Sequence, residues 1–226
     1  MTSSDEGQDR MTFRVIDAGT ITAGDLALVL GLFDATYERA NHAYLEKSLT
    51  KLRHLAIAMD GGVAAGFALA DARVIDLPRL PAQAVNFAGM CCIGPQFRRR
   101  GLFPRLERMA AMTADVRPAG RWLSAGRMAH PVSFRVMRQN PSAVPRGGIE
   151  PTAWQQEVGA AIADAYGVAA FDPRTFVCGG SGVPIGYPRM EIDVDDEEWI
   201  AFRGVNRDRG DSLLGLVWAP DAPEGW

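Results

Sequence analysis

The segment from Ile93 to Phe103 combines residue types that could hold a phosphate group; its sequence is Ile-Gly-Pro-Gln-Phe-Arg-Arg-Arg-Gly-Leu-Phe. An apolar, β-favouring run at 85–93 leads into it, and a helix-compatible segment at 104–113 follows. The first amides of a helix have no intrahelical acceptor and lie at the positive end of the helix dipole. Three guanidinium groups would add long-range attraction and bidentate contacts. The pattern predicts a phosphate-binding turn between a strand and a helix.

Two familiar phosphate loops do not match this turn. The string G-x-x-x-x-G-K-[ST] of the P-loop is absent from the chain, and the dinucleotide fingerprint G-x-G-x-x-G needs three glycines where the turn has only Gly101. A basic strand-to-helix turn on an ordinary surface would show the same residues. The sequence leaves both interpretations open, phosphate binding being the one that accounts for the clustered arginines.

Length and composition describe an ordinary globular protein. The chain has 226 residues, of which 47% are hydrophobic and 23% charged, enough for one large domain or two small ones. Its net charge of −3 argues against a general nucleic-acid binder, so the arginines at 98–100 are a local feature. A small anionic ligand fits this distribution better than a polyanion does.

The N-terminal segment and the cysteines predict the cellular compartment of the protein. Residues 1–10 are polar and acidic, so we expect a disordered lead without a signal peptide. No run reaches the roughly 18 apolar residues that a membrane span needs. The cysteines Cys91, Cys92 and Cys178 lack metal-ligand spacing and are odd in number. We therefore expect a cytoplasmic protein with reduced thiols, without a metal, and without nucleic-acid or membrane partners.

Apolar periodicity and turn formers predict an α/β (α+β) fold. Strands are expected at 13–16, 55–59, 63–70, 85–93, 122–125, 189–194 and 213–219. Helices are expected from about 23 to 41 and at 43–52, 104–113, 130–138, 152–166 and 195–205, with an irregular loop at 171–188.

The turn resembles the acyl-CoA signature of the GNAT superfamily of N-acyltransferases, which runs V-x-P-x-x-[RQ]-x-x-G-x-[GA]. Ile93 takes the place of Val, Pro95 that of Pro, Arg98 that of Arg and Gly101 that of the central Gly. Phe103 departs from the pattern, because a small residue is usual at its position. The departure bears on how closely the loop wraps a pyrophosphate.

The expected order of elements is also similar to that of the GNAT superfamily. Over about residues 12–140 it runs strand, two helices, hairpin, strand, helix, strand, helix. The resemblance implies a central mixed sheet of about six to seven strands flanked by helices. We expect residues 11–226 to form a single domain, in which 141–226 is an elaborated C-terminal part.

The resemblance implies acetyl-CoA or another acyl-CoA as co-substrate. Backbone groups of the strand before the turn would bind the pantetheine arm and polarise the thioester carbonyl. Amides of the turn would hold the pyrophosphate, and a side chain of the later helix could touch the CoA arm. The expected CoA-binding residues are Cys91, Cys92, Ile93, Arg98, Arg99, Arg100, Gly101, Leu102, Phe103 and Ser133.

The residues that handle protons in the family are replaced in this chain. His130 stands where an Asn is usual and Met137 where a Tyr is usual, and the strand 85–93 lacks the customary Glu. His130 is the first candidate, since a helix N-terminus would keep it neutral and able to accept a proton before donating one. Tyr187 is a second candidate acid. The structural alternative for His130 is that it only caps the helix, and the alternative for Tyr187 is that it only anchors its loop.

Two further groups of residues have a functional and a structural interpretation. Cys91 and Cys92 could act as nucleophiles, although buried strand cysteines are more often small hydrophobes. In the family, the segment that holds Tyr37, Asn41 and His42 lines the acceptor pocket. Those three residues are therefore expected to bind substrate, or else they form a turn.

The resemblance implies an N-acyltransferase that moves a non-amino-acyl group, acetyl in the simplest case, from CoA to an amine of a small molecule by direct attack of the amine on the thioester. One alternative is a thioester binder that performs decarboxylation or hydrolysis, or that senses acyl-CoA. A second is a non-enzymatic interaction module. The sequence is compatible with a homodimer and does not determine the oligomeric state.

Overall fold

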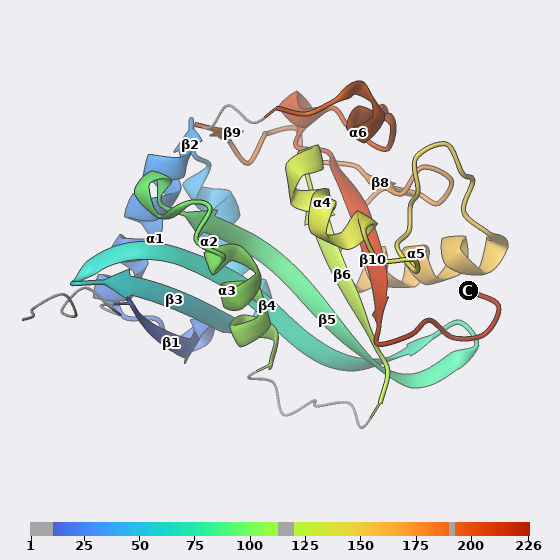
Figure 1. The fold of residues 1–226 in the computed structure, drawn as a ribbon, viewed down its shortest axis with the longest axis horizontal. Helices are drawn as coiled ribbons and strands as arrows, with labels where there is room; N and C mark the ends of the chain where they lie inside the picture. The colour runs from blue at the N-terminus through green and yellow to red at the C-terminus, as the bar shows by residue number, and fades with distance from the viewer. Residues whose placement is uncertain (1–10, 113–119, 190–192) are drawn as a thin grey trace, which may run out of the picture. The chain divides into compact units, whose positions relative to one another are not determined.

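The computed structural model describes residues 11–112, 120–189 and 193–226. Those residues divide into two compact units, which we describe separately. Unit 1 holds residues 11–71, 89–112 and 186–189, and unit 2 holds 72–88, 120–185 and 193–226. The two long strands of one hairpin, β4 and β5, contribute a stretch to each unit (Figure 1).

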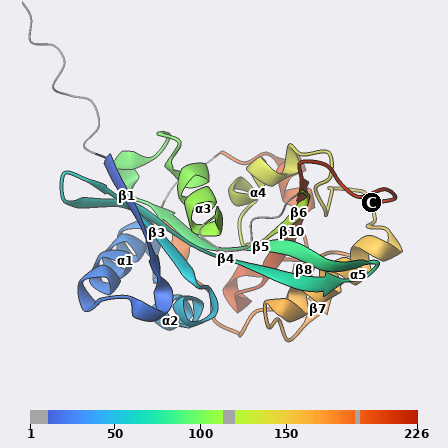
Figure 2. The ribbon, with the colours of Figure 1, turned by 90° about the horizontal axis from the view of Figure 1, so that it is seen from below.

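Unit 1 contains the elements that lead to the arginine turn. They are β1 (Met11–Asp17), α1 (Ala23–Thr36), β2 (Tyr37–Glu38), α2 (His42–Lys51), β3 (His54–Asp60), the first part of β4 (Val63–Leu77), the end of β5 (Leu80–Ile93), α3 (Leu102–Met112) and β9 (Tyr187–Pro188). The helices α1 and α2 lie on one face of the sheet strands and α3 on the other (Figure 2). The two helices, the hairpin and the strand that enters the turn are confirmed as elements. Their bounds differ, since α1 ends at Thr36 rather than near 41, and β4 and β5 are longer than the expected 63–70 and 85–93.

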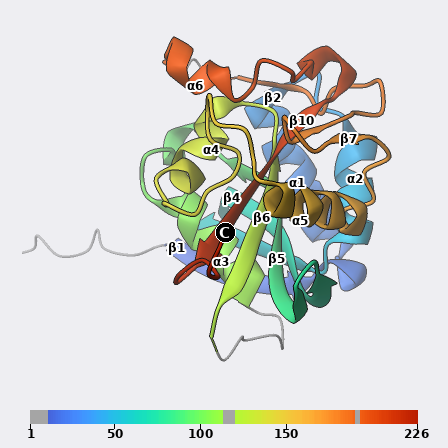
Figure 3. The same cartoon turned by 90° about the vertical axis from the view of Figure 1, so that its right-hand side faces the viewer.

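Unit 2 contains the rest of β4 and β5 and most of the C-terminal half of the chain. Its other elements are β6 (Trp122–Met128), α4 (Pro131–Arg138), α5 (Ala153–Ala165), β7 (Phe171–Asp172), β8 (Val177–Cys178), α6 (Asp196–Ile200) and β10 (Ser212–Ala219). The helices α4 and α5 lie on opposite sides of β6 and β10 (Figure 3). Trp218 of β10 is fully buried in this unit.

The described residues form a mixed sheet of eight strands in the order β1-β3-β4-β5-β6-β10-β8-β7, and β2 pairs separately with β9. β5 and β6 are parallel, while β1–β3, β3–β4, β6–β10, β10–β8 and β7–β8 are antiparallel. The predicted α/β class with helices flanking a mixed sheet is confirmed. The sheet has more strands than the six to seven expected, because β7 and β8 extend it.

The largest differences from the sequence prediction lie after residue 140. The segment 171–188, expected to be irregular, contains the three two-residue strands β7, β8 and β9. Strands this short have no apolar alternation to reveal them; partner strands supply their hydrogen bonds. The helix expected at 195–205 is shorter, since α6 ends at Ile200 and turns follow. The strand expected at 189–194 falls largely outside the described residues.

Helix ends follow the local chemistry of the sequence closely. Thr152 caps α5 in a capping box with Gln155, and Gly167 ends that helix at φ +70°. Pro131 occupies the first turn of α4, after the cap residue His130. The helices expected at 130–138 and 152–166 begin and end close to these positions, because side chains within a few residues determine helix ends.

Candidate functional site

The arginine turn of unit 1 has an unusual backbone. After β5, Gly94 donates its amide to the carbonyl of Ala65 at 2.9 Å, and a short 3-10 helix at Pro95–Phe97 follows. Arg99 then adopts φ +63° and Gly101 φ +71°, both in the left-handed region, immediately before α3. A non-glycine residue has a steric cost in that region, and such residues are enriched at functional sites.

The three arginines of the turn have different surroundings. Arg98 is half-buried and donates from Nε to the carbonyl oxygen of Ile93 at 3.4 Å, so it fastens the turn to the end of its own strand. Arg100 lies over the ring of Phe97, 5.5 Å from its centroid. Arg99 is exposed, and no other described residue forms a hydrogen bond or ion pair with its guanidinium. Arg99 is therefore the arginine best able to meet a phosphate.

The glycine of the turn is required by its backbone rather than by crowding. A Cβ atom added at Gly101 would meet nothing within 4 Å, so the position is open to solvent. Its positive φ is the reason for glycine. Leu102 is buried and anchors the start of α3, while Phe103 is half-buried. The first amides of α3 thus begin at an exposed, positively charged turn.

The strand cysteines are poor candidates for covalent chemistry. Burial raises the pKa of the Cys91 thiol well above its ordinary value, with a further rise from the charge of Glu107. Burial also raises the pKa of Cys92, to about 12, although a bond with Thr36 opposes the rise. Both thiols are therefore protonated at neutral pH, whereas the thiolate is the nucleophile. Their side chains disfavour the nucleophile hypothesis, and a role for their backbone groups stays a prediction.

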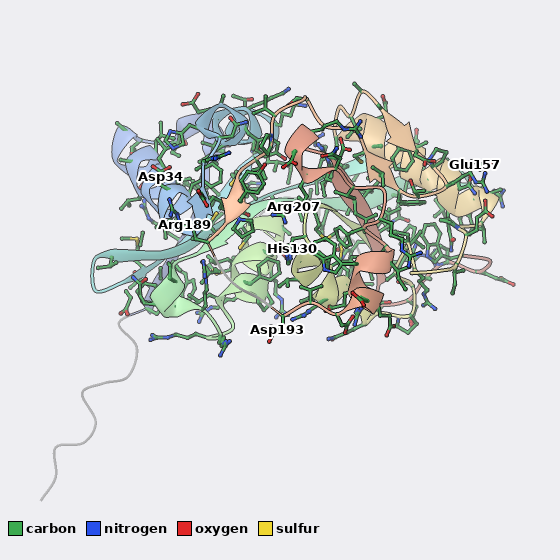
Figure 4. All side chains as sticks on the ribbon, turned by 90° about the horizontal axis from the view of Figure 1, so that it is seen from above. Asp34, His130, Glu157, Arg189, Asp193 and Arg207 are labelled. Carbon is green, nitrogen blue, oxygen red and sulfur yellow. The ribbon has the colours of Figure 1, made fainter. Side chains whose placement is uncertain are left out.

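Unit 1 also brings the expected acceptor segment beside Tyr187. The backbone of Tyr187 in β9 pairs with Glu38, and Pro188 pairs with Tyr37. Arg189 donates from Nε to the carbonyls of Asp34, at 3.3 Å, and of Tyr37, at 3.1 Å (Figure 4). Segments some 150 residues apart in the sequence thus meet here. Sequence patterns could not have revealed this contact, since neither two-residue strand carries a periodic signal.

The other two residues expected to bind substrate have structural partners. Asn41 caps α2, and its side-chain oxygen accepts the amide of Tyr44 at 3.1 Å. His42 places Nε2 2.7 Å from a carboxylate oxygen of Asp34. These contacts correspond to the turn-forming interpretation, and substrate binding by Tyr37, Asn41 and His42 stays a prediction.

His130 lies in unit 2, at the start of α4. Its Nδ1 accepts the amide of Val132 at 3.3 Å, and its ring meets that of Trp199 edge-on at 5.4 Å. Burial lowers the pKa of His130, as do the positive charges of Arg207 and Arg135, and Glu198 opposes them only partly. Figure 4 shows His130 and Arg207 close together within this unit. The imidazole is therefore neutral at pH 7.

The helix cap also determines which nitrogen of His130 carries the proton. A neutral imidazole has one donor and one acceptor nitrogen, and Nδ1 is the acceptor of the Val132 amide. The proton must then lie on Nε2. The ring is consequently placed to donate a hydrogen bond from Nε2, rather than to accept a proton first as the sequence suggested. Neighbouring Ser133 is exposed.

A bidentate ion pair supports the same part of unit 2. Arg135 of α4 places Nε and one terminal nitrogen each 2.7 Å from the carboxylate oxygens of Glu198 in α6. The hydrogen bonds from Arg135 hold the pKa of Glu198 down at about 2. From the sequence, the segment around Glu198 was expected only to belong to a helix at 195–205. The structure shows that Glu198 is buried and ties α6 to α4.

The described residues contain neither a metal-binding cluster nor a membrane-spanning helix. No group of three or more His, Cys, Asp or Glu side chains among them could hold a metal ion. Within the described parts of the chain, every helix is too short or too polar to cross a bilayer.

Comparison with known proteins shows likeness in structure alone. No family model matches the chain, and no curated protein matches its sequence. Among solved structures it resembles the ribosomal-protein-S18-alanine N-acetyltransferase from Escherichia coli, with a TM-score of 0.46 and 9% identity over 95% of this chain and 99% of that one.

Two other solved acetyltransferases are similar over part of the chain. The aminoglycoside N-acetyltransferase AAC(6')-Iy, in complex with CoA, has a TM-score of 0.42 and 20% identity over 57% of this chain and 85% of its own. A putative acetyltransferase of the GNAT family from Desulfovibrio desulfuricans has a TM-score of 0.42 and 16% identity over 57% and 82%. Because all three TM-scores lie below 0.5, nothing about activity follows from these likenesses.

Proposed function

We propose that this protein is an acyl-CoA-dependent N-acyltransferase, which transfers a non-amino-acyl group, acetyl in the simplest case, to an amine of a small molecule. The observation that carries the proposal is the turn between β5 and α3. There Arg99 and Gly101 both adopt left-handed conformations, and Arg99 is exposed without a partner among the described residues. An exposed cationic turn at a helix start supports a pyrophosphate ligand.

The residues of unit 1 have distinct tasks in this proposal. The Arg99 guanidinium and the first amides of α3 bind the pyrophosphate of CoA, while Arg98 keeps the turn attached to Ile93. Backbone groups of Cys91 to Ile93 bind the pantetheine arm and orient the thioester. Correct orientation of two reactants accounts for several kcal/mol of a barrier. The protein thus contributes mainly positioning.

Acyl transfer forms a bond between the amine nitrogen and the thioester carbonyl carbon and breaks the bond from that carbon to sulfur. The amine loses a proton and the leaving thiolate gains one. The proposal assigns to neutral His130 a hydrogen-bond donor role, through Nε2, toward negative charge that develops in this step. Tyr187, whose backbone pairs with Glu38, stays the second candidate for the acid. The acceptor is assigned to Tyr37, Asn41 and His42.

Calorimetric titration with CoA and with pantetheine, which lacks the pyrophosphate, tests the binding half of the proposal. The wild-type protein should bind CoA at least tenfold more tightly. Gly101→Asp should weaken CoA binding by more than tenfold, because it sets a carboxylate against phosphate and strains a left-handed backbone. Arg99→Ala should weaken it by about tenfold, through loss of one charge-assisted hydrogen bond.

Gly148→Asp is the matched control, since Gly148 has φ +78° and open space around it but lies in unit 2. It carries the same strain and charge without touching the turn, and CoA affinity should be unchanged. Equal binding of CoA and pantetheine, or equal losses in the two aspartate variants, would refute phosphate recognition at the turn.

Turnover decides between acyl transfer and the alternatives. Incubation with acetyl-CoA and a panel of small amines should release free thiol only when an amine is present. Thiol release without an amine would instead support thioester hydrolysis. Tight CoA binding without any thiol release would support a sensor.

A further inference from the structure

Tyr166, the residue that follows α5, reaches two neighbouring parallel strands of unit 2. Its hydroxyl oxygen lies 2.9 Å from the carbonyl oxygen of Ala88 in β5 and 2.9 Å from that of Ala125 in β6. Both acceptors are backbone groups far from it in the sequence. The tyrosine belongs to the C-terminal part at 141–226, in which the sequence suggested a chemical role for Tyr187 and none for Tyr166.

The two carbonyls lie where the pairing of β5 with β6 stops. The parallel register runs from Val85 opposite Leu123 to Ala88 opposite Gly126 and goes no further. β6 continues to Met128 in its pairing with β10. In an uninterrupted parallel ladder, carbonyls between the strands accept amides of the neighbouring strand. Here a side-chain hydroxyl, with one proton to donate, takes the place of those amides.

The position of this hydroxyl is well determined by its surroundings. The Tyr166 ring meets the ring of Phe87 edge-on at 4.9 Å, and Phe87 is fully buried. The guanidinium of Arg73 lies over the Phe87 ring, 4.9 Å from its centroid, and donates a hydrogen bond to the carbonyl of Ala165 at 3.3 Å. The left-handed Gly167 then turns the chain away from the helix. The end of α5 is therefore held against β5 from several directions.

We propose that Tyr166 is a positioning residue that ends the β5–β6 pairing at Ala88 and so sets the course of the following β5 backbone. That backbone includes Cys91 to Ile93, to which the proposed function assigns the pantetheine arm, so this inference rests on the proposed function. If the last residue pair of the β5–β6 ladder shifts, the backbone groups of Cys91 to Ile93 that are assigned to the thioester shift as well. The ring can stay in place without its hydroxyl, which makes Tyr166→Phe the informative change.

The control is Ser142→Ala. Ser142 is buried, and its hydroxyl oxygen accepts the amide of Trp218 at 2.9 Å and lies 2.8 Å from Oδ1 of Asn140 and 3.3 Å from the carbonyl oxygen of Trp218. Both substitutions remove one hydroxyl bonded to strand backbone in unit 2, but only Tyr166 is bonded to β5. A general loss of stability affects both variants, whereas a change at the end of the β5–β6 pairing affects only Tyr166→Phe.

Hydrogen exchange measured by mass spectrometry on peptides covering 85–93 and 122–128 reads the pairing directly. Tyr166→Phe should exchange at least tenfold faster there, with the β6–β10 partner peptide at 212–219 unchanged. Its kcat with acetyl-CoA and a small amine should fall about tenfold, while the CoA dissociation constant changes less than twofold. Ser142→Ala should show neither effect.

Unchanged exchange in Tyr166→Phe, or an equal change in Ser142→Ala, would overturn the inference even in an active enzyme. Faster exchange with wild-type kcat would overturn the positioning role. A wild-type protein that does not bind CoA would refute the proposed function instead, and the exchange measurement would still report whether Tyr166 ends the strand pairing.

Discussion

Glu107 of α3 should make the stability of the protein depend on pH near neutrality. The side chain is half-buried in unit 1, and no hydrogen bond or ion pair from another described residue satisfies its carboxylate. Burial alone raises the pKa of Glu107 from 4.5 to about 7. An unpartnered carboxyl group in this position resists ionisation because the charged form loses solvation.

The sign and size of the effect follow from that pKa. A raised pKa means that the folded state holds the proton more strongly than the unfolded state does, so the contribution to stability is complete below pH 4.5. It is lost as the pH rises through about 7. At 1.36 kcal/mol for each pH unit between the two pKa values, the loss is at most about 3 kcal/mol. Partial exposure of the side chain to solvent reduces this figure.

Glu107→Gln removes the ionisation and keeps the shape. Urea unfolding between pH 5 and pH 8 should show the variant gaining up to about 3 kcal/mol relative to wild type as the pH rises. Glu46→Gln, at an exposed position of α2 in the same unit, should show no such trend. A difference between Glu107→Gln and wild type that stays constant across this range would refute the reasoning, as would one of opposite sign.

Three further outcomes are expected. Glu198→Gln should lower the melting temperature at pH 7, and the difference should vanish as the pH falls from 4.5 toward 2, because the lowered pKa of Glu198 gives stability only while the group is ionised; an equal difference at both ends would contradict the ion pair with Arg135. His130→Ala should lower turnover about 100-fold with CoA affinity nearly unchanged; unchanged turnover, or lost CoA binding, would assign His130 a structural role. Treatment with a chelator and with a reductant should leave the far-ultraviolet circular dichroism unchanged, and loss of signal would show a metal or disulfide to be needed.

Several features of this protein could be predicted from the sequence because neighbours along the chain determine them. The Thr152 cap, the Gly167 helix end and the first-turn Pro131 each depend on side chains within a few residues. The turn before α3 was predicted for the same reason, since strand, arginines and Gly101 are consecutive. The neutral state of His130 was also expected, although burial and two arginines, rather than the helix dipole that the sequence suggested, are its causes.

Other features depend on residues that meet only in the folded chain. The hydroxyl of Tyr166 bonds to a carbonyl 78 residues away, and Arg135 pairs with a carboxylate 63 residues away. The strand β9 forms because β2 offers it a partner. Burial of Glu107, which no sequence pattern marks, comes from the packing of α3 in unit 1. Local propensity carries no information about such pairings, so helix ends and turns were determined by the sequence itself, and the partners of buried polar groups by the tertiary structure.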